Sequence, residues 1–469
     1  MNSFFRKKSI DRLQEEGTGK SEFQRVLGLW QLTAIGLGGI IGVGIFVLTG
    51  VAAAEHAGPA VILSFIIAGL ASAAAALCYA EFAGLIPVAG SAYTYSYAVL
   101  GEGAAWLIGW DLLMEYTLVI AVVAIGWSGY MQEILAQIGI HLPVWAQGAP
   151  GTGEGHKMDL ISMFISLGIA GLLTTGIKWG ARFNNVMVLI KLAIVLVVIA
   201  IGSFFVEPAN WNPFMPFGFH GVMGGAALVF FAVFGYDTLT TAAEESKNPQ
   251  RDLPKAVILS LTIALCLYVG MSLVITGMAH YDTLNNAAPI AKAFANVGLN
   301  WITVIISVAA ITGILSVLFS FMLACSRIWF SMSRDGLLPK WFAKVHSTYK
   351  TPYRPTILIG VIAAIVAGLT PINEVAELVN IGTLSAFILI CSSIIVLRKK
   401  RPDLERRFRT PFVPVVPIIG ICFSIYLIIS LPSITWIRFI IWMLIGMVLY
   451  YFYGRRKSKL SEMGETNGK

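Results

Sequence analysis

The chain has 469 residues, of which 57% are hydrophobic and only 12% are charged, and its mean hydropathy is +0.78. A soluble domain carries about 25% charged residues, so this composition excludes a water-soluble globular protein and predicts one that spans a membrane. We attribute the formal net charge of +8 to basic residues that gather on one side of the membrane, and we expect no nucleic-acid partner.

Apolar segments of about 20 residues recur along the whole chain, and each is long enough to cross a hydrocarbon core of about 30 Å. The polar N-terminal stretch and the length of the first apolar segment argue against a cleavable signal peptide. The pattern predicts an all-α polytopic membrane protein with twelve transmembrane helices, near residues 30–53, 60–85, 103–134, 160–177, 184–206, 219–244, 254–279, 300–332, 355–371, 375–397, 413–431 and 434–453.

Basic residues predict how these helices are oriented. An even number of spans places both termini on one side of the membrane. Of the 33 Lys and Arg residues, 28 fall in the two tails and in the loops on that side, at 178–183, 245–255, 333–354 and 398–412. The positive-inside rule therefore places both termini in the cytoplasm. The sequence contains no Asn-x-Ser/Thr sequon, which favours a bacterial plasma membrane over a secretory one.

The first span contains GGIIGVGIF at residues 38–46. Glycine weakens a helix interior by about 1 kcal/mol relative to alanine, so its repetition needs a physical reason. One interpretation is close helix packing through Gly38 and Gly42. The other, which we favour, is that Gly39, Gly42 and Gly44 let the helix break near the bilayer midplane. The amides that open its second half would then attract a carboxylate.

The third span carries two acidic residues. Glu115 lies about a dozen residues into the span, near the midplane, and Asp111 lies one turn earlier. An ionisable residue at this depth is costly unless it is used. Two interpretations stay open: the Glu115 carboxylate meets a cationic group of a bound ligand, or it is a structural acid that is hydrogen-bonded to a neighbouring helix.

Lys191 lies about seven residues into the fifth span, roughly 10 Å from its cytoplasmic end at 1.5 Å per residue. No acidic residue lies three or four positions away on that helix. Burial disfavours a charged ammonium, so this lysine could lose its proton near neutral pH. We predict that Lys191 is a site that binds and releases a proton. The alternative is that its side chain snorkels to the interface.

The sixth span has FFAVFGYD at residues 230–237, which combines bulky aromatic residues with Gly235 and the acidic Asp237. A second break here would be the counterpart of the break in span 1 and would indicate an inverted 5+5 repeat with broken helices 1 and 6. We expect Asp237 to bind backbone groups locally. The predicted organisation is a cytoplasmic tail at 1–28, repeat one at 29–206, repeat two at 207–397, a basic loop with helices 11 and 12 at 398–453, and a second cytoplasmic tail at 454–469.

Further ionisable residues fall at the cytoplasmic ends of the predicted helices. Glu244, Glu245 and Arg251 are expected at the cytoplasmic mouth, either solvated or in ion pairs that break on opening. Three others are interpreted as structural or gating residues: Glu81, Glu102 and Arg327. The five cysteines have no short pairing motif, and the histidines form no H-E-x-x-H motif. We therefore expect no disulfide, no metal, no cofactor and no enzyme activity.

Four stretches carry a family resemblance. GLGGIIGVGIFVLTG (36–50) resembles the first helix of the amino acid–polyamine–organocation (APC) superfamily, and GYDTLTTAAEESKNPQRDLPKAV (235–257) is similar to the helix 6–7 segment of its cationic amino acid transporter family. PVAGSAYTYSYAVLGEGAAWLIGWDLLMEYTL (87–118) and RIWFSMSRDGLLPKWFAKVH (327–346) resemble the same family's helix 2–3 and helix 8–9 regions. The resemblance covers about residues 28–400 and implies a leucine-transporter-type fold in a twelve-helix, bacterial-type member.

The resemblance also implies a substrate site built from main-chain groups. The substrate carboxylate would bind the backbone amides of Ile41, Gly42, Val43, Gly44 and Ile45, and its ammonium would bind the carbonyls of Ile40, Phe231, Ala232 and Phe234. Phe231 is the candidate gate, with simple core packing as the alternative. The Lys191 ammonium would occupy the position of a coupling sodium ion, against helix 1 carbonyls and a helix 8 hydroxyl, Ser316 or Ser320.

These features favour a proton-coupled symporter that imports L-amino acids, cationic or small and neutral (arginine, lysine, ornithine or alanine-like), by alternating access. The alternatives are an amino acid exchanger, a sodium-coupled carrier, or an amino-acid sensor on the same scaffold. The protein would work with protons and the lipid bilayer, and a small membrane accessory subunit is conceivable. A channel is disfavoured because the sequence shows no carbonyl filter and no dense series of intramembrane charges.

Overall fold

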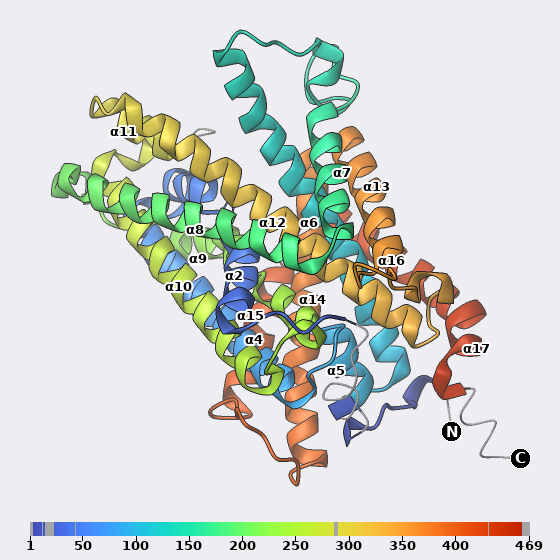
Figure 1. Ribbon diagram of the computed structural model, residues 1–469. Helices are drawn as coiled ribbons and strands as arrows, with labels where there is room; N and C mark the ends of the chain where they lie inside the picture. The colour runs from blue at the N-terminus through green and yellow to red at the C-terminus, as the bar shows by residue number, and fades with distance from the viewer. Residues whose placement is uncertain are drawn as a thin grey trace, which may run out of the picture.

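The computed structural model describes residues 3–11, 13–14, 23–42, 44–285, 289–429 and 431–461 (Figure 1). Within these ranges, eight helices are long and apolar enough to cross a membrane, and four more apolar helices have 10–17 residues. Together they correspond one to one to the twelve predicted segments. The fold-class prediction of an all-α polytopic membrane protein is thus confirmed.

The first five spans are formed by the following elements: α2 (Leu29–Ile40) continued by η2 (Gly44–Leu48), α3 (Thr49–Ala52) and η3 (Ala53–Ala57); η4 (Gly58–Ala60) and α4 (Val61–Leu85); α6 (Glu102–Gln137); α7 (Leu160–Thr174); and α8 (Ile177–Gly202). The connections contain η1 (Ser3–Phe5), α5 (Ala92–Val99), η5 (Val144–Ala146), η6 (Ser203–Phe205) and η7 (Pro208–Trp211). The helix α5 was not predicted from the sequence.

The remaining spans are α9 (Gly218–Val229) with η8 (Phe230–Ala232) and η9 (Tyr236–Glu245); α10 (Pro249–Met278); α12 (Asn300–Arg334); α13 (Tyr353–Leu369); α14 (Ile372–Lys400); α15 (Val415–Ile429); and α16 (Ser433–Leu449). Shorter elements are η10 (Tyr281–Leu284), α11 (Pro289–Asn296), η11 (Lys340–Ala343), η12 (Tyr450–Gly454) and α17 (Arg455–Lys457). The helix α11, between spans 7 and 8, was likewise not predicted.

Helices that are five spans apart pack against each other. Helix α4 packs on α10, α6 on α12, and α7 on α13. Two inverted repeats of five helices bring equivalent helices together in this way. Helices α15 and α16 pack on α14 from outside these pairs. The observed pairs are those expected for the 5+5 arrangement, whereas the repeat boundaries at residues 29–206 and 207–397 stay predictions.

The interior of the bundle is built around α6. Its 36 residues would extend about 54 Å, and 89% of its most apolar window is buried, compared with 17% for the window that includes α16. Because α6 also packs on α12, α13 and α14, its side chains have few routes to lipid. The side chains at the interface of α6 and α12 are therefore shielded from lipid and can line a site inside the bundle.

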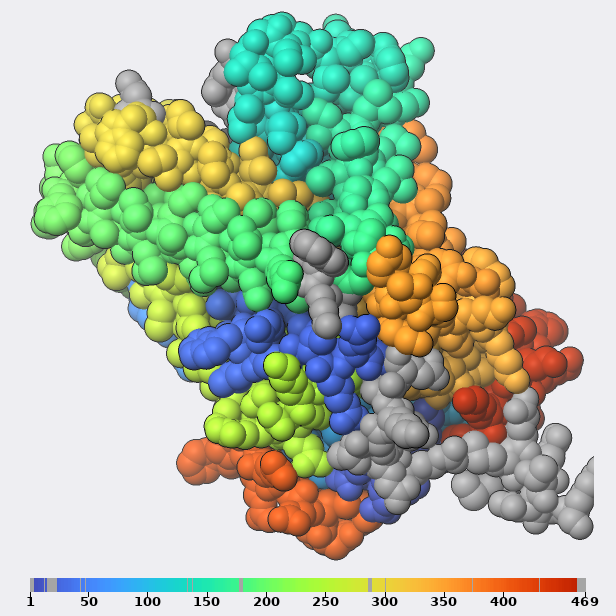
Figure 2. Space-filling view, viewed as in Figure 1, coloured from blue at the N-terminus to red at the C-terminus, as the bar shows by residue number. Residues whose placement is uncertain are grey.

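Both described terminal segments lie at the same end of the bundle. At one end, Lys8 of the N-terminal segment forms an ion pair with Asp335, and the backbone N–H of Lys459 donates to the Asp335 carbonyl. We call this end, which carries both described terminal segments (Figure 1), the basic end. At the opposite end the molecule divides into two arms, one around α11 and one around the α6–α7 connection (Figure 2).

A cavity of about 390 Å³ lies at this opposite end. Its lining includes Phe46 from the second half of span 1, Tyr130 and Ile134 from α6, Ile290 from α11, and Ser307 from α12. We call it the far-end cavity. It joins elements of both repeats on the side of the molecule that is remote from the two terminal segments.

Candidate functional site

Span 1 is broken at the glycine-rich stretch. Helix α2 ends at Ile40, and Ile41 has extended backbone (φ −82°, ψ 104°) although its N–H still donates to the Leu37 carbonyl at 3.0 Å. Helical structure resumes at Gly44, and Val43 lies outside the described residues. The first amides of a helix have no intrahelical acceptor. The first amides of the second half of span 1 therefore lack intrahelical acceptors, and the break lies where the sequence predicts it.

Span 6 is broken at the same level. The 3₁₀ segment η8 ends at Ala232, and Gly235 has φ +110°, a backbone conformation that L side chains rarely adopt. The two breaks touch through their backbones, because a Cβ added to Gly39 would lie only 2.6 Å from the Gly235 carbonyl oxygen. A Cβ on Gly38 would lie 2.6 Å from Ser320 Oγ of α12. The glycines therefore serve both purposes, the break and close helix packing.

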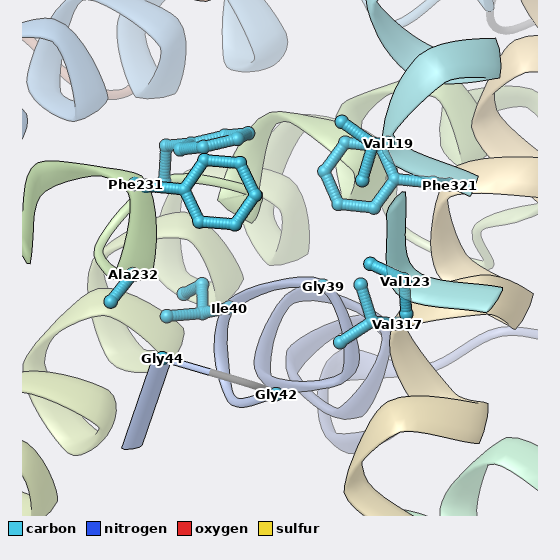
Figure 3. Close-up of a pocket in the computed structure, with 11 residues that line it drawn as sticks. Gly39, Ile40, Gly42, Gly44, Val119, Val123, Phe231, Ala232, Val317 and Phe321 are labelled. Carbon is cyan, nitrogen blue, oxygen red and sulfur yellow. The ribbon is translucent and has the colours of Figure 1, made fainter. Parts of the chain in front are cut away.

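A small cavity lies between the two breaks (Figure 3). It has about 20 Å³, the space of one or two water molecules. Its lining is Gly39, Ile40, Gly42, Gly44, Val119, Val123, Phe231, Ala232, Phe234, Val317 and Phe321, none of which carries a charge. Figure 3 shows Phe231 facing Val119 and Phe321 across the space. A leucine-sized ligand would require these walls to move apart.

Most of the predicted substrate residues line this cavity. Those that do are Ile40, Gly42, Gly44, Phe231, Ala232 and Phe234, whereas Ile41 and Ile45 are fully buried next to it. The side chains of α6 and α12 that complete the wall were not singled out from the sequence. Val119 and Val123 are four residues apart, as are Val317 and Phe321, but apolar residues occur on every face of both helices. No pattern in the sequence marks the face that lines the cavity.

Aromatic side chains cross the cavity. The half-buried Phe231 packs edge to face on Phe234, with ring centroids 5.3 Å apart, and Phe234 packs in the same way on Phe321 at 6.1 Å. Below them, the Tyr268 hydroxyl donates to the Ile40 carbonyl at 3.0 Å. Phe231 is thus the member of this row that is least buried, the position expected of a lid that rotates over a ligand.

Lys191 is fully buried beside the break in span 1. Its Nζ donates to the Leu37 carbonyl at 3.0 Å, to the Ile41 carbonyl at 2.7 Å and to Ser316 Oγ at 2.6 Å. Ser320, the other predicted hydroxyl, donates instead to the Ile35 carbonyl at 3.0 Å. The side chain therefore points inward to α2 and α12 and does not snorkel to the interface.

Three carboxylates, those of Asp111, Glu115 and Asp237, lie where α6 meets α14 and η9. The Glu115 Oε1 atom accepts a hydrogen bond from Thr383 of α14 at 2.6 Å, and Tyr116 donates to Asp237. One oxygen each of Asp111, Glu115 and Asp237 is buried without a hydrogen-bond partner among the described residues. Glu115 does not line the cavity. Its contact with α14 favours the structural interpretation over direct contact with substrate.

Ion pairs connect η9 to α12 between the cavity and the basic end. Arg327 Nη2 lies 2.6 Å from Glu245 Oε1, and each side chain is 1% exposed. Arg334 pairs with Glu244 at 2.8 Å. Removing one partner of a buried pair typically costs about 3–5 kcal/mol because the other charge is stranded. These pairs therefore hold η9 against α12 at this end of the bundle.

The other charged residues singled out from the sequence are structural in this arrangement. Glu81 accepts two hydrogen bonds from Arg398 of α14. Glu102 accepts from the hydroxyls of Tyr97, Tyr450 and Ser458, and so joins the start of α6 to the end of the chain. Arg251 is exposed.

Comparison with known proteins agrees with this arrangement. A sequence model described as "Amino acid permease" matches residues 27–450. The chain is 48% identical to a methylthioribose transporter of Bacillus subtilis, over 98% of this chain and 100% of that protein. It is 47% identical to the branched-chain amino acid permease BcaP of the same organism, over 98% of this chain and 99% of that protein.

A more distant relative is a vacuolar cationic amino acid transporter 4 of Arabidopsis thaliana, 31% identical over 98% of this chain and 97% of that protein. The matches extend over both breaks, the buried lysine and the ion pairs at the basic end. The chain therefore belongs to the amino acid permease family of the APC superfamily.

Proposed function

We propose that the protein is a proton-coupled secondary transporter that imports L-amino acids with apolar side chains by alternating access. Membership of the amino acid permease family makes it a membrane transport protein and not an enzyme. The observation that carries the proposal is the position of the Lys191 ammonium, held against the break in span 1 beside an apolar cavity. Exchange without proton coupling, sodium coupling and substrate sensing are the alternatives.

Main-chain groups at the two breaks supply partners for both charged ends of an amino acid. The amides of residues 41–45 would bind the carboxylate, and the carbonyls of Ile40 and of residues 231–234 would bind the ammonium. The Ile40 carbonyl already accepts from Tyr268, but a carbonyl oxygen has two lone pairs and can accept a second hydrogen bond. No charged side chain is needed for this recognition.

The lining of the cavity supports an apolar substrate side chain. Three valines and Phe321 lie across the space from Phe231 (Figure 3), and no lining side chain carries a negative charge that could pair with a distal cation. The relatives named above transport branched-chain amino acids in one case and methylthioribose in another. A branched aliphatic side chain would replace water in this cavity and gain about 0.8 kcal/mol for each buried CH₂ group.

A cationic substrate is the second candidate. It is supported by the unpaired Oε2 of Glu115 and by similarity to a cationic amino acid transporter. Binding of its distal cation would require Glu115 to turn from Thr383 toward the cavity, since its other oxygen accepts a hydrogen bond from that residue at 2.6 Å. The apolar candidate needs no such rearrangement.

The hydrogen bonds of Lys191 suggest how a proton would act. An ammonium has three N–H donors, and Nζ has three close acceptors, Leu37, Ile41 and Ser316. Ser316 Oγ lies 2.6 Å from the Gly313 carbonyl, to which it donates, so its lone pair is free for the lysine. A neutral amine has one donor fewer, so proton loss would leave one acceptor unpaired and loosen the backbone at the break.

Alternating access would open the two ends of the bundle in turn. We propose that the basic end faces the cytoplasm of a bacterial cell, as the positive-inside rule requires. The pairs Arg327–Glu245 and Arg334–Glu244 would close that side, while the far-end cavity would form part of the outer entry path. Lys191 would be protonated from outside and would release its proton inward, because the two conformations differ in their affinity for it.

Competition for uptake of labelled leucine into proteoliposomes tests the substrate class. We expect leucine, isoleucine and valine to compete and arginine and lysine not to compete, because the cavity has no charge for their side chains. Isoamylamine, which lacks the carboxylate, should bind at least roughly tenfold more weakly, the loss expected for one hydrogen bond to a charged group. Equal competition by isoamylamine would contradict the carboxylate site, and competition by arginine alone would favour the cationic candidate.

The variant Glu115→Gln separates the two candidates further. Because Glu115 contacts α14 and does not line the cavity, we expect this variant to keep the wild-type affinity for leucine and to bind arginine as weakly as the wild-type protein does. Binding of both amino acids by the purified protein is the measurement. A selective loss of arginine binding would mean that the Glu115 carboxylate pairs with the substrate.

A further inference from the structure

A second cavity, remote from the substrate site, lies at the basic end. It has about 450 Å³ and is lined by Arg6, Tyr451, Arg455, Arg456 and Ser461. It is formed where the N-terminal segment meets the end of the last membrane helix, and Figure 1 shows α17 beside that segment. Neither the substrate nor the proton path described above involves it.

The positive charge of this cavity is not neutralised by the part of the protein that the structure describes. Within that part, none of the three arginines forms an ion pair, and the Nη1 atom of Arg6 is buried without a hydrogen-bond partner. Arg455 stacks on the Tyr451 ring at 5.7 Å. The nearby Glu102 carboxylate is occupied by three hydroxyl donors. Three guanidinium groups around one space are suited to a phosphate group, which they bind through paired hydrogen bonds.

The position of the cavity indicates where such a phosphate would come from. The outer face of α16 exposes Ile441, Leu444 and Val448, each more than half exposed, and the same helix continues into η12 and Tyr451. In a bilayer this apolar face is covered by acyl chains. The arginines follow it directly along the chain, at the depth of the phospholipid headgroups.

We propose that this cavity binds the headgroup of an anionic phospholipid in the leaflet at the basic end. The lipid phosphate would join Arg6 to Arg455 and Arg456 and so connect the N-terminal segment to α17. The same segment contacts α6, where the Glu102 N–H donates to the Arg6 carbonyl at 2.8 Å, and α12, where Lys8 pairs with Asp335. The bound lipid stabilises the conformation in which the basic end is closed.

Native mass spectrometry of the full chain in detergent, titrated with phosphatidylglycerol or phosphatidylcholine, tests the proposal. The double variant Arg455→Gln/Arg456→Gln should bind phosphatidylglycerol about 100-fold more weakly, since each hydrogen bond between a guanidinium group and the phosphate contributes roughly a tenfold gain in affinity. Phosphatidylcholine binding should not change. The matched control is Lys457→Gln/Lys459→Gln, which removes the same charge from the same segment but no residue that lines the cavity.

Equal weakening in the control variant would mean that general surface charge attracts the lipid, and would overturn the proposal. So would equal affinity of the wild-type protein for the two lipids. Inorganic phosphate added to the titration separates a soluble anion from a lipid: displacement of phosphatidylglycerol by millimolar phosphate would assign the cavity to soluble anions. Arg6→Gln provides an independent variant on the other wall, with an expected loss of roughly tenfold.

Discussion

Replacement of Gly44 by valine is expected to abolish transport in a protein that still folds. A Cβ at this position would lie 2.4 Å from Ala232 Cβ and 3.0 Å from Ala232 Cα, so the two breaks would be forced apart. Such overpacking typically costs about 1–3 kcal/mol, which a bundle of this size can tolerate. The displaced amides would lose their hydrogen bonds to the substrate carboxylate, and a loss of two at about 1.5 kcal/mol each corresponds to roughly a hundredfold weaker uptake.

Gly168→Val on α7 is the control for this variant, because a Cβ there would meet nothing within 4 Å. Gel filtration and thermal unfolding of both variants would show that each is folded. Uptake of leucine should be normal in Gly168→Val and absent in Gly44→Val. Normal uptake by Gly44→Val would mean that the substrate is not bound at the break in span 1.

Replacement of Lys191 by methionine is expected to separate coupling from transport. Methionine fills a similar space but has no donor for the carbonyls of Leu37 and Ile41, which the ammonium now pairs. The break would then respond to substrate but not to protons. Accumulation of leucine driven by a pH gradient should be lost, while exchange of labelled for unlabelled leucine across the membrane persists.

Two serine variants test the role of Lys191 in proton coupling without removing the lysine. Ser316 accepts a hydrogen bond from Lys191, whereas Ser320, one turn further along α12, donates to Ile35 and is not bonded to the lysine. Ser316→Ala should therefore shift the pH dependence of uptake, and Ser320→Ala should leave it unchanged. Equal shifts in both variants would indicate a general disturbance of α12 and would contradict a specific role for the lysine contacts.

The membrane spans and the two breaks could be predicted because their signals are local. Apolar length decides whether a helix crosses a bilayer, and the breaks need glycine where the backbone departs from helical geometry, as at Gly235 with φ +110°. The buried lysine could also be predicted, since an ammonium in an apolar span needs polar partners. The partners of this lysine could be predicted in part, because the break in span 1 leaves backbone carbonyls available next to it.

The walls of the cavity and the ion pairs could not be predicted from the sequence alone. Val119 and Phe321 belong to long helices whose apolar residues do not gather on one face, so hydrophobic periodicity does not reveal which face lines the cavity. Arg327 and Glu245 are 82 positions apart, and only the packing of η9 on α12 brings them together. The short helices α5 and α11 are too brief to give a periodic signal and are fixed by contacts with the longer helices.

The most direct test of the central claim is leucine accumulation by the wild-type protein in sealed vesicles with an imposed pH gradient and no sodium. The account predicts that vesicles with an alkaline interior concentrate leucine above the outside level, that dissipating the pH gradient releases it, and that a sodium gradient alone gives no accumulation. A strict requirement for sodium, or equal accumulation by Lys191→Met under the pH gradient, would contradict it.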